Sequence, residues 1–135
     1  MSDNRFKTWH IARTIFFAIW LLCVITTVIM AVMPADYMPT QPGADKMLHM
    51  LTFCLLTIWP TMTFDKPLHI LGAAGFLIAA GISIELLQML SPTRNTELMD
   101  IVFDTIGIGA GLIIGYLFRE SYQSLVPQEP APLSH

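Results

Sequence analysis

Long apolar stretches without basic residues are the feature that most constrains this chain. Residues 14–33 and 47–64 carry no charge, whereas residues 68–90 and 99–118 are interrupted only by one or two acidic side chains. A helix needs about 20 apolar residues to cross a bilayer, and lipid tolerates only helices or closed barrels. Because strict alternation of apolar and polar residues is absent, we predict an all-α polytopic membrane protein, a bundle of four transmembrane helices over these ranges.

The composition supports this class and excludes others. Hydrophobic residues make up 54% of the chain and charged residues 13%, whereas a soluble domain carries about 25% charged residues. The net charge of −3 gives no basic signature for nucleic acid, and two cysteines cannot form a disulfide framework. We expect one membrane domain, residues 1–125, followed by a polar, proline-rich cytoplasmic tail, residues 126–135, that is disordered.

The basic residues predict the orientation. With the N-terminus inside, five basic residues lie on the cytoplasmic side and two on the outer side, so both termini are expected in the cytoplasm. The first apolar segment is about 20 residues long, more than a cleaved signal peptide normally has, and we expect it to be retained. The cytoplasmic set is Arg5, Lys7, Arg13, Lys66 and Arg119, and the outer set is Lys46 and Arg94.

Polar side chains gather on the expected outer side of the membrane. A carboxylate at bilayer depth costs about 2.5–3.5 kcal/mol on insertion scales, so it faces protein or water and is a functional candidate. These residues belong to three of the predicted helices and one connection. They are Asp45, Lys46 and His49, then Glu85 and Gln88, then Arg94, then Asp100 and Asp104.

Helical spacing indicates where the acidic side chains point. Asp100 and Asp104 are four residues apart, on one face that continues through Gly107, Gly111 and Gly115. Such a stripe of small residues lets helices approach closely. The acidic face of the fourth helix is therefore predicted to pack inside the bundle.

Several of these residues also have purely structural interpretations. Asp45 could cap the second helix, Lys46 could be an interfacial anchor, and His49 could be an ordinary packed histidine. Asp100 suits the start of a helix dipole, and Arg94 could be a solvated loop residue. Glu85 and Asp104, which lie deepest, are the hardest to explain structurally.

At these residues the sequence resembles the VanZ-like family of small bacterial membrane proteins. The resemblance rests on Asp45-Lys46-Met47-Leu48-His49, on Glu85-Leu86-Leu87-Gln88, on Pro92-Thr93-Arg94, and on Asp100 to Gly107. The family pattern is Asp-Lys-x-x-His, Glu-x-x-Gln, an arginine after a proline, and Asp-x-x-x-Asn-x-x-Gly. This chain departs from it at Asp104, where the family usually has asparagine, and at Thr93.

The resemblance implies a protein of the bacterial inner (plasma) membrane that is grouped with enzymes acting on lipid head groups. One member is linked to teicoplanin resistance, a glycopeptide phenotype that need not extend to this chain. The implied partners are membrane lipid and a lipid-linked phosphate or peptidoglycan precursor. No nucleic acid is expected.

We therefore interpret the polar set as the site of an enzyme at the outer leaflet. His49 would act as general acid or base, oriented by Asp45, with Glu85 as a second acid–base group. Lys46 and Arg94 would bind an anionic phosphate. The expected catalytic residues are His49, Glu85, Asp104 and Asp45, and the expected substrate-binding residues are Lys46, Gln88, Arg94 and Asp100.

Two questions stay open at this level. Asp100 and Asp104 could bind a divalent cation, magnesium or manganese, or could hold the basic residues in a hydrogen-bond network. The protein could also be a non-enzymatic module for lipid binding or immunity, or a small transporter-type subunit. Because the acidic residues crowd one side of the membrane, a conducting pathway is disfavoured, whereas a binding protein and an enzyme are not separated.

Overall fold

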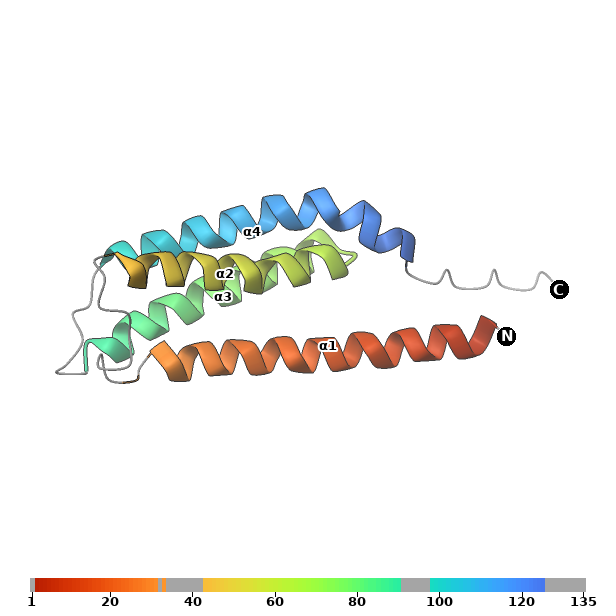
Figure 1. The fold of residues 1–135 in the computed structure, drawn as a ribbon, viewed down its shortest axis with the longest axis horizontal. Helices are drawn as coiled ribbons and strands as arrows, with labels where there is room; N and C mark the ends of the chain where they lie inside the picture. The colour runs from red at the N-terminus through yellow and green to blue at the C-terminus, as the bar shows by residue number, and fades with distance from the viewer. Residues whose placement is uncertain (1, 32, 34–42, 91–97, 126–135) are drawn as a thin grey trace.

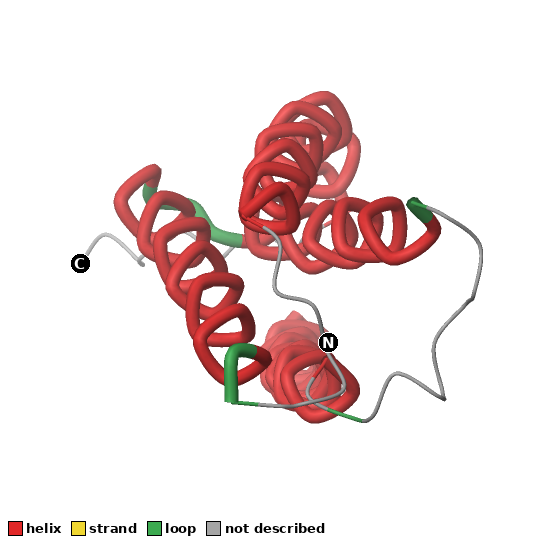
Figure 2. The backbone as a smooth tube through the Cα atoms, turned by 90° about the vertical axis from the view of Figure 1, so that its left-hand side faces the viewer, coloured by secondary structure: helices red, strands yellow, loops and turns green. Residues whose placement is uncertain are grey.

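The computed structural model describes residues 2–31, 33, 43–90 and 98–125, with side chains from residue 7 onward. Four helices make up the described structure: α1 (Ser2–Ala31), α2 (Ala44–Thr63), α3 (Pro67–Gln88) and α4 (Leu98–Leu125). Within these ranges all regular structure is helical (Figures 1 and 2). The all-α class is confirmed, and α2 and α3 begin and end within three residues of their predicted limits.

Three of the described helices are long and apolar enough to cross a membrane, namely Lys7–Ala31 within α1, α3 and α4. Large apolar side chains such as Leu55 and Leu117, which are 68% and 73% exposed, suit a lipid-facing surface. α2 is not among the three, because its first turn is polar. It contacts each of the other helices, so neighbouring protein shields much of its surface.

α1 and α4 are longer than the apolar pattern predicts. α1 begins at Ser2 rather than at residue 14, and α4 continues to Leu125 rather than ending at residue 118. The apolar stretch marks the part of a helix that lipid covers, whereas the helix itself continues with polar residues into the interface. The predicted disordered tail, residues 126–135, lies outside the described residues.

The glycine stripe of α4 packs directly against α2, as the spacing predicts. A Cβ atom on Gly107 would collide with the backbone of Met50, and one on Gly111 would lie 2.5 Å from the carbonyl oxygen of Cys54. At these positions only hydrogen fits between the two helices. α2 and α4 form the closest helix pair of the bundle (Figure 1).

Pro60 lies inside α2 without ending it, since the helix continues to Thr63. Proline has no backbone N–H, so the carbonyl of Leu56, one turn earlier, loses its helical donor. The indole Nε1 of Trp20 on α1 donates to this oxygen at 2.7 Å. The described consequence of the proline is this polar tie between α1 and α2.

Two arginines, one toward the start of α1 and one toward the end of α4, form hydrogen bonds with the end of α2. Arg13 Nη2 donates to the carbonyl of Thr63 at 3.2 Å, and Arg119 Nη1 donates to that of Thr61 at 3.0 Å. Arg13 also lies 3.8 Å from the Asp65 carboxylate. Cations suit the unsatisfied carbonyls of a helix C-terminus. The start of α1 and the end of α4 therefore lie at the same end of the bundle (Figure 1).

Candidate functional site

A buried histidine–aspartate pair lies at the other end of the bundle. His49 Nδ1 and Asp104 Oδ1 are 3.0 Å apart, and the two side chains are 12% and 3% exposed. With Asp104 ionised, Nδ1 is the donor, which leaves Nε2 of the imidazole as the proton acceptor. The pair joins α2 to α4 where the glycine stripe of α4 brings the two helices together.

The partner of His49 differs from the one expected. The sequence predicted that Asp45, one turn earlier on α2, orients the imidazole, and this assignment is wrong. The Asp45 carboxylate lies 3.9 Å from Lys46 Nζ instead, and it does not cap α2, which begins after Gly43. The close approach of α4 brings Asp104 within hydrogen-bonding distance of His49.

Gly81 of α3 makes room for the Asp104 carboxylate. A Cβ atom at Gly81 would lie 2.7 Å from Asp104 Oδ2 and 3.5 Å from the ring of Phe53. Oδ2 is buried and accepts no hydrogen bond from the described part of the chain. The carboxylate therefore has one oxygen committed to His49 and one oxygen available to a further donor.

Two more acidic side chains surround this pair. Glu85 on α3 and Asp100 on α4 are 3% and 5% exposed, and both lie close enough to His49 to interact with it electrostatically. We call these four residues, His49, Glu85, Asp100 and Asp104, the polar cluster. Three helices contribute to it, and the roles of its members in chemistry stay predictions.

The side chain of Gln88 is buried and makes a structural hydrogen bond, rather than lying exposed at the site. Its side chain is 2% exposed, and Nε2 donates to the carbonyl of Ala31 at 2.8 Å. This carbonyl belongs to the last turn of α1, where a helix lacks intrahelical donors. Gln88 therefore ties the end of α3 to the end of α1, beside the polar cluster.

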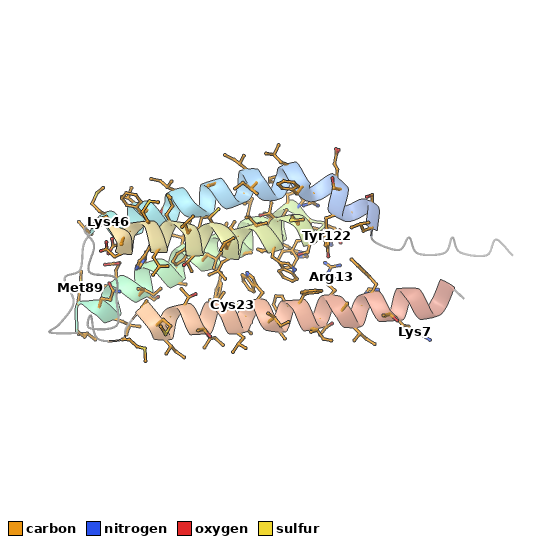
Figure 3. All side chains as sticks on the ribbon, viewed as in Figure 1. Lys7, Arg13, Cys23, Lys46, Met89 and Tyr122 are labelled. Carbon is orange, nitrogen blue, oxygen red and sulfur yellow. The ribbon has the colours of Figure 1, made fainter. Side chains whose placement is uncertain are left out.

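The rim of the site is less buried. The side chains of Lys46 and Asp45 are 21% and 43% exposed. Lys46 lies, like Met89, at the left of Figure 3, at the end opposite Arg13. Arg94, the other expected phosphate-binding residue, lies outside the described residues.

The described residues contain no group of three or more His, Cys, Asp or Glu side chains placed to hold a metal ion. The divalent-cation alternative therefore has no ligand set in this part of the chain. The hydrogen bond between His49 and Asp104 agrees with the other alternative, in which the acidic residues hold the basic residues in a hydrogen-bond network.

Comparison with known proteins identifies the family. Searches of curated proteins and of solved structures returned no match. The sequence profile of the family described as VanZ/LLP1 matches residues 3–119, which include all four helices up to the last turns of α4. This chain is a membrane protein that belongs to the VanZ/LLP1 family.

Proposed function

We propose that this protein acts on the phosphate-containing head group of a membrane lipid at the outer leaflet, with His49 as its acid–base group. The observation that carries the proposal is the partly buried hydrogen bond between His49 and Asp104. An imidazole fixed by a carboxylate in a partly desolvated site is a common arrangement for proton transfer.

The geometry suggests how the proton would move. His49 Nε2 takes the proton of an attacking hydroxyl as a new bond to phosphorus forms. The bond from phosphorus to the leaving oxygen then breaks, and Glu85 in its neutral form supplies the proton to that oxygen. Asp104 stabilises the imidazolium without taking its proton, as a carboxylate does for a catalytic histidine.

The head group would be held by cations at the rim. Lys46 is partly exposed at the start of α2. We place this end of the helix at the membrane surface, where the lipid phosphates lie. Arg94 is proposed as a second contact, because a guanidinium can bind phosphate with two parallel hydrogen bonds. The acidic members of the polar cluster lie deeper than Lys46, which separates phosphate binding from proton transfer.

The test is turnover by purified protein. The protein is reconstituted in vesicles that contain defined phospholipids and a prenyl phosphate, with magnesium or with a chelator, and head groups are followed by mass spectrometry. We expect the wild type and His69→Gln to change a head group, and His49→Gln to abolish that change. His69 is the matched control, because it is an exposed histidine of α3 near the opposite end.

A lipid-binding module without turnover is the second candidate. The observation that favours it is the make-up of the polar cluster, which holds neither a serine nor a cysteine to act as a nucleophile. The same preparations distinguish the two. Lipids that copurify with the wild type and not with His49→Gln, with every head group unchanged, would replace the enzymatic proposal by a binding one.

A further inference from the structure

An apolar groove of about 360 Å³ runs between α1 and α2. Aromatic rings form one part of its wall, and aliphatic and small side chains form the rest. Cys23, which lies about midway along the molecule in Figure 3, is one of the small ones. The groove is lined in part by Phe16, Trp20, Cys23 and Thr27 of α1 and by Thr52 and Trp59 of α2.

The groove exists because α1 is held by polar ties more than by side-chain packing. The hydrogen bond from Trp20 to the Leu56 carbonyl fixes the two helices, and the rings of Trp20 and Trp59 stack with centroids 6.2 Å apart. Of the described α1 side chains, only Val24 and Ala31 are buried apolar residues. Next to these contacts, the space between α1 and α2 is not filled by side chains.

The groove leads toward the polar cluster. Along α2 its lining extends from Trp59 back to Thr52, and Thr52 is three residues after His49. Residues three apart are neighbours on a helix surface, so the groove ends about one turn from the imidazole. An apolar groove next to a polar cluster fits a molecule with a chain and a head group.

We infer that this groove holds one hydrocarbon chain of the phospholipid whose head group reaches the polar cluster. The inference rests on the proposed function and names its substrate class: a lipid bound through its chain, rather than a water-soluble phosphoester. The groove lies along α1, which is long and apolar enough to cross a membrane, so hydrocarbon would be the surrounding medium. The lipid would enter sideways from the bilayer, between α1 and α2.

Tryptophan quenching by brominated lipid tests the inference. The chain has three tryptophans, and in a Trp9→Phe background the remaining two, Trp20 and Trp59, both line the groove. The full-length protein in detergent is titrated with a phospholipid brominated on its acyl chain. We expect quenching that saturates at one lipid per protein molecule.

Two matched variants report whether the lipid occupies the groove. Thr27→Phe fills it, whereas Thr105→Phe adds the same side chain to an exposed position of α4. Both threonines bond the carbonyl four residues earlier, at 2.9 and 2.8 Å, so both substitutions remove an equivalent hydrogen bond. We expect Thr27→Phe, still folded by circular dichroism, to lose the saturable quenching and Thr105→Phe to keep it.

The outcomes separate this inference from the proposed function. Quenching that rises without saturation in the parent protein, or that is equal in folded Thr27→Phe and Thr105→Phe, would overturn the groove as a chain site. His49→Gln should keep the saturable quenching, because the chain contacts stay intact. Saturable quenching in a protein that never alters a head group would support the groove and contradict the enzymatic proposal alone.

Discussion

Replacing one glycine of α4 with alanine should separate α2 from α4. In Gly111→Ala the new methyl group would lie 2.5 Å from the carbonyl oxygen of Cys54 and 2.7 Å from Thr57 Cβ. Ordinary contacts of a carbon atom begin near 3.5 Å. One of these neighbours is backbone, which cannot rotate away, so the helices must move apart by about 1 Å.

The size of the effect follows from this overlap. Adding a methyl group to a packed interface costs about 1–3 kcal/mol, and the displacement would also disturb the neighbouring contacts of Gly107 and Gly115. Gly109 is the control, since a Cβ atom there meets nothing within 4 Å. Gly109→Ala should stabilise the helix by about 0.5–1 kcal/mol, because alanine is the better helix former.

The assay is reversible unfolding in mixed micelles, followed by circular dichroism. We expect the free energy of unfolding to fall for Gly111→Ala and to stay level or rise for Gly109→Ala. Equal stability of Gly111→Ala and the wild type would mean that the stripe does not set the distance between α2 and α4, and this account of the packing would be refuted.

Three further predictions concern α1, the site and the orientation. Trp20→Phe should lower the free energy of unfolding by about 1–3 kcal/mol, because the Leu56 carbonyl loses its donor in an apolar setting; unchanged stability in denaturation curves would contradict this. Gly81→Ala should keep the wild-type stability but reduce turnover in the vesicle assay, since the methyl group displaces the Asp104 carboxylate rather than backbone. Turnover equal to that of the wild type would show that this position of the carboxylate is not required for activity. Reporters fused to either terminus should be active only as cytoplasmic markers, and a C-terminal fusion active outside the membrane would reverse the orientation.

Much of the helical architecture could be predicted from the sequence, because its signals are local. Long apolar stretches predicted the helices, and helical spacing predicted that Asp100, Asp104 and the glycines share a buried face. The lengths of α1 and α4 could not be predicted in this way, since a helix can continue into water without an apolar pattern. Four spans were predicted, and three of the described helices are long and apolar enough to be spans; the fourth helix, α2, contacts each of the other three.

The pairings within the site could not be predicted, because they depend on how helices meet. Spacing favoured Asp45 as the partner of His49, since both lie on α2, but packing of α4 brings Asp104 closer. Gln88 resembles a ligand-binding residue in sequence, and its bond to the end of α1 is visible only in three dimensions. Nothing local identified Trp20 as the donor to the Leu56 carbonyl, which Pro60 leaves without its helical donor.

The measurement that tests the central claim most directly compares the stability and the activity of Glu85→Gln. Glutamine keeps the shape and hydrogen-bonding capacity of the side chain but removes its ionisable proton. Burying a carboxylate in a membrane costs free energy. If the glutamate is retained for its chemistry, replacing it with glutamine should therefore not lower the free energy of unfolding.

We predict that Glu85→Gln accumulates as monodisperse protein with a free energy of unfolding equal to or above that of the wild type, and that its head-group turnover per folded molecule is lost. Gly111→Ala provides the contrast, with less folded protein. Full turnover per folded molecule in Glu85→Gln, or a loss of stability as large as that of Gly111→Ala, would contradict the account and would show the glutamate to be part of the fold.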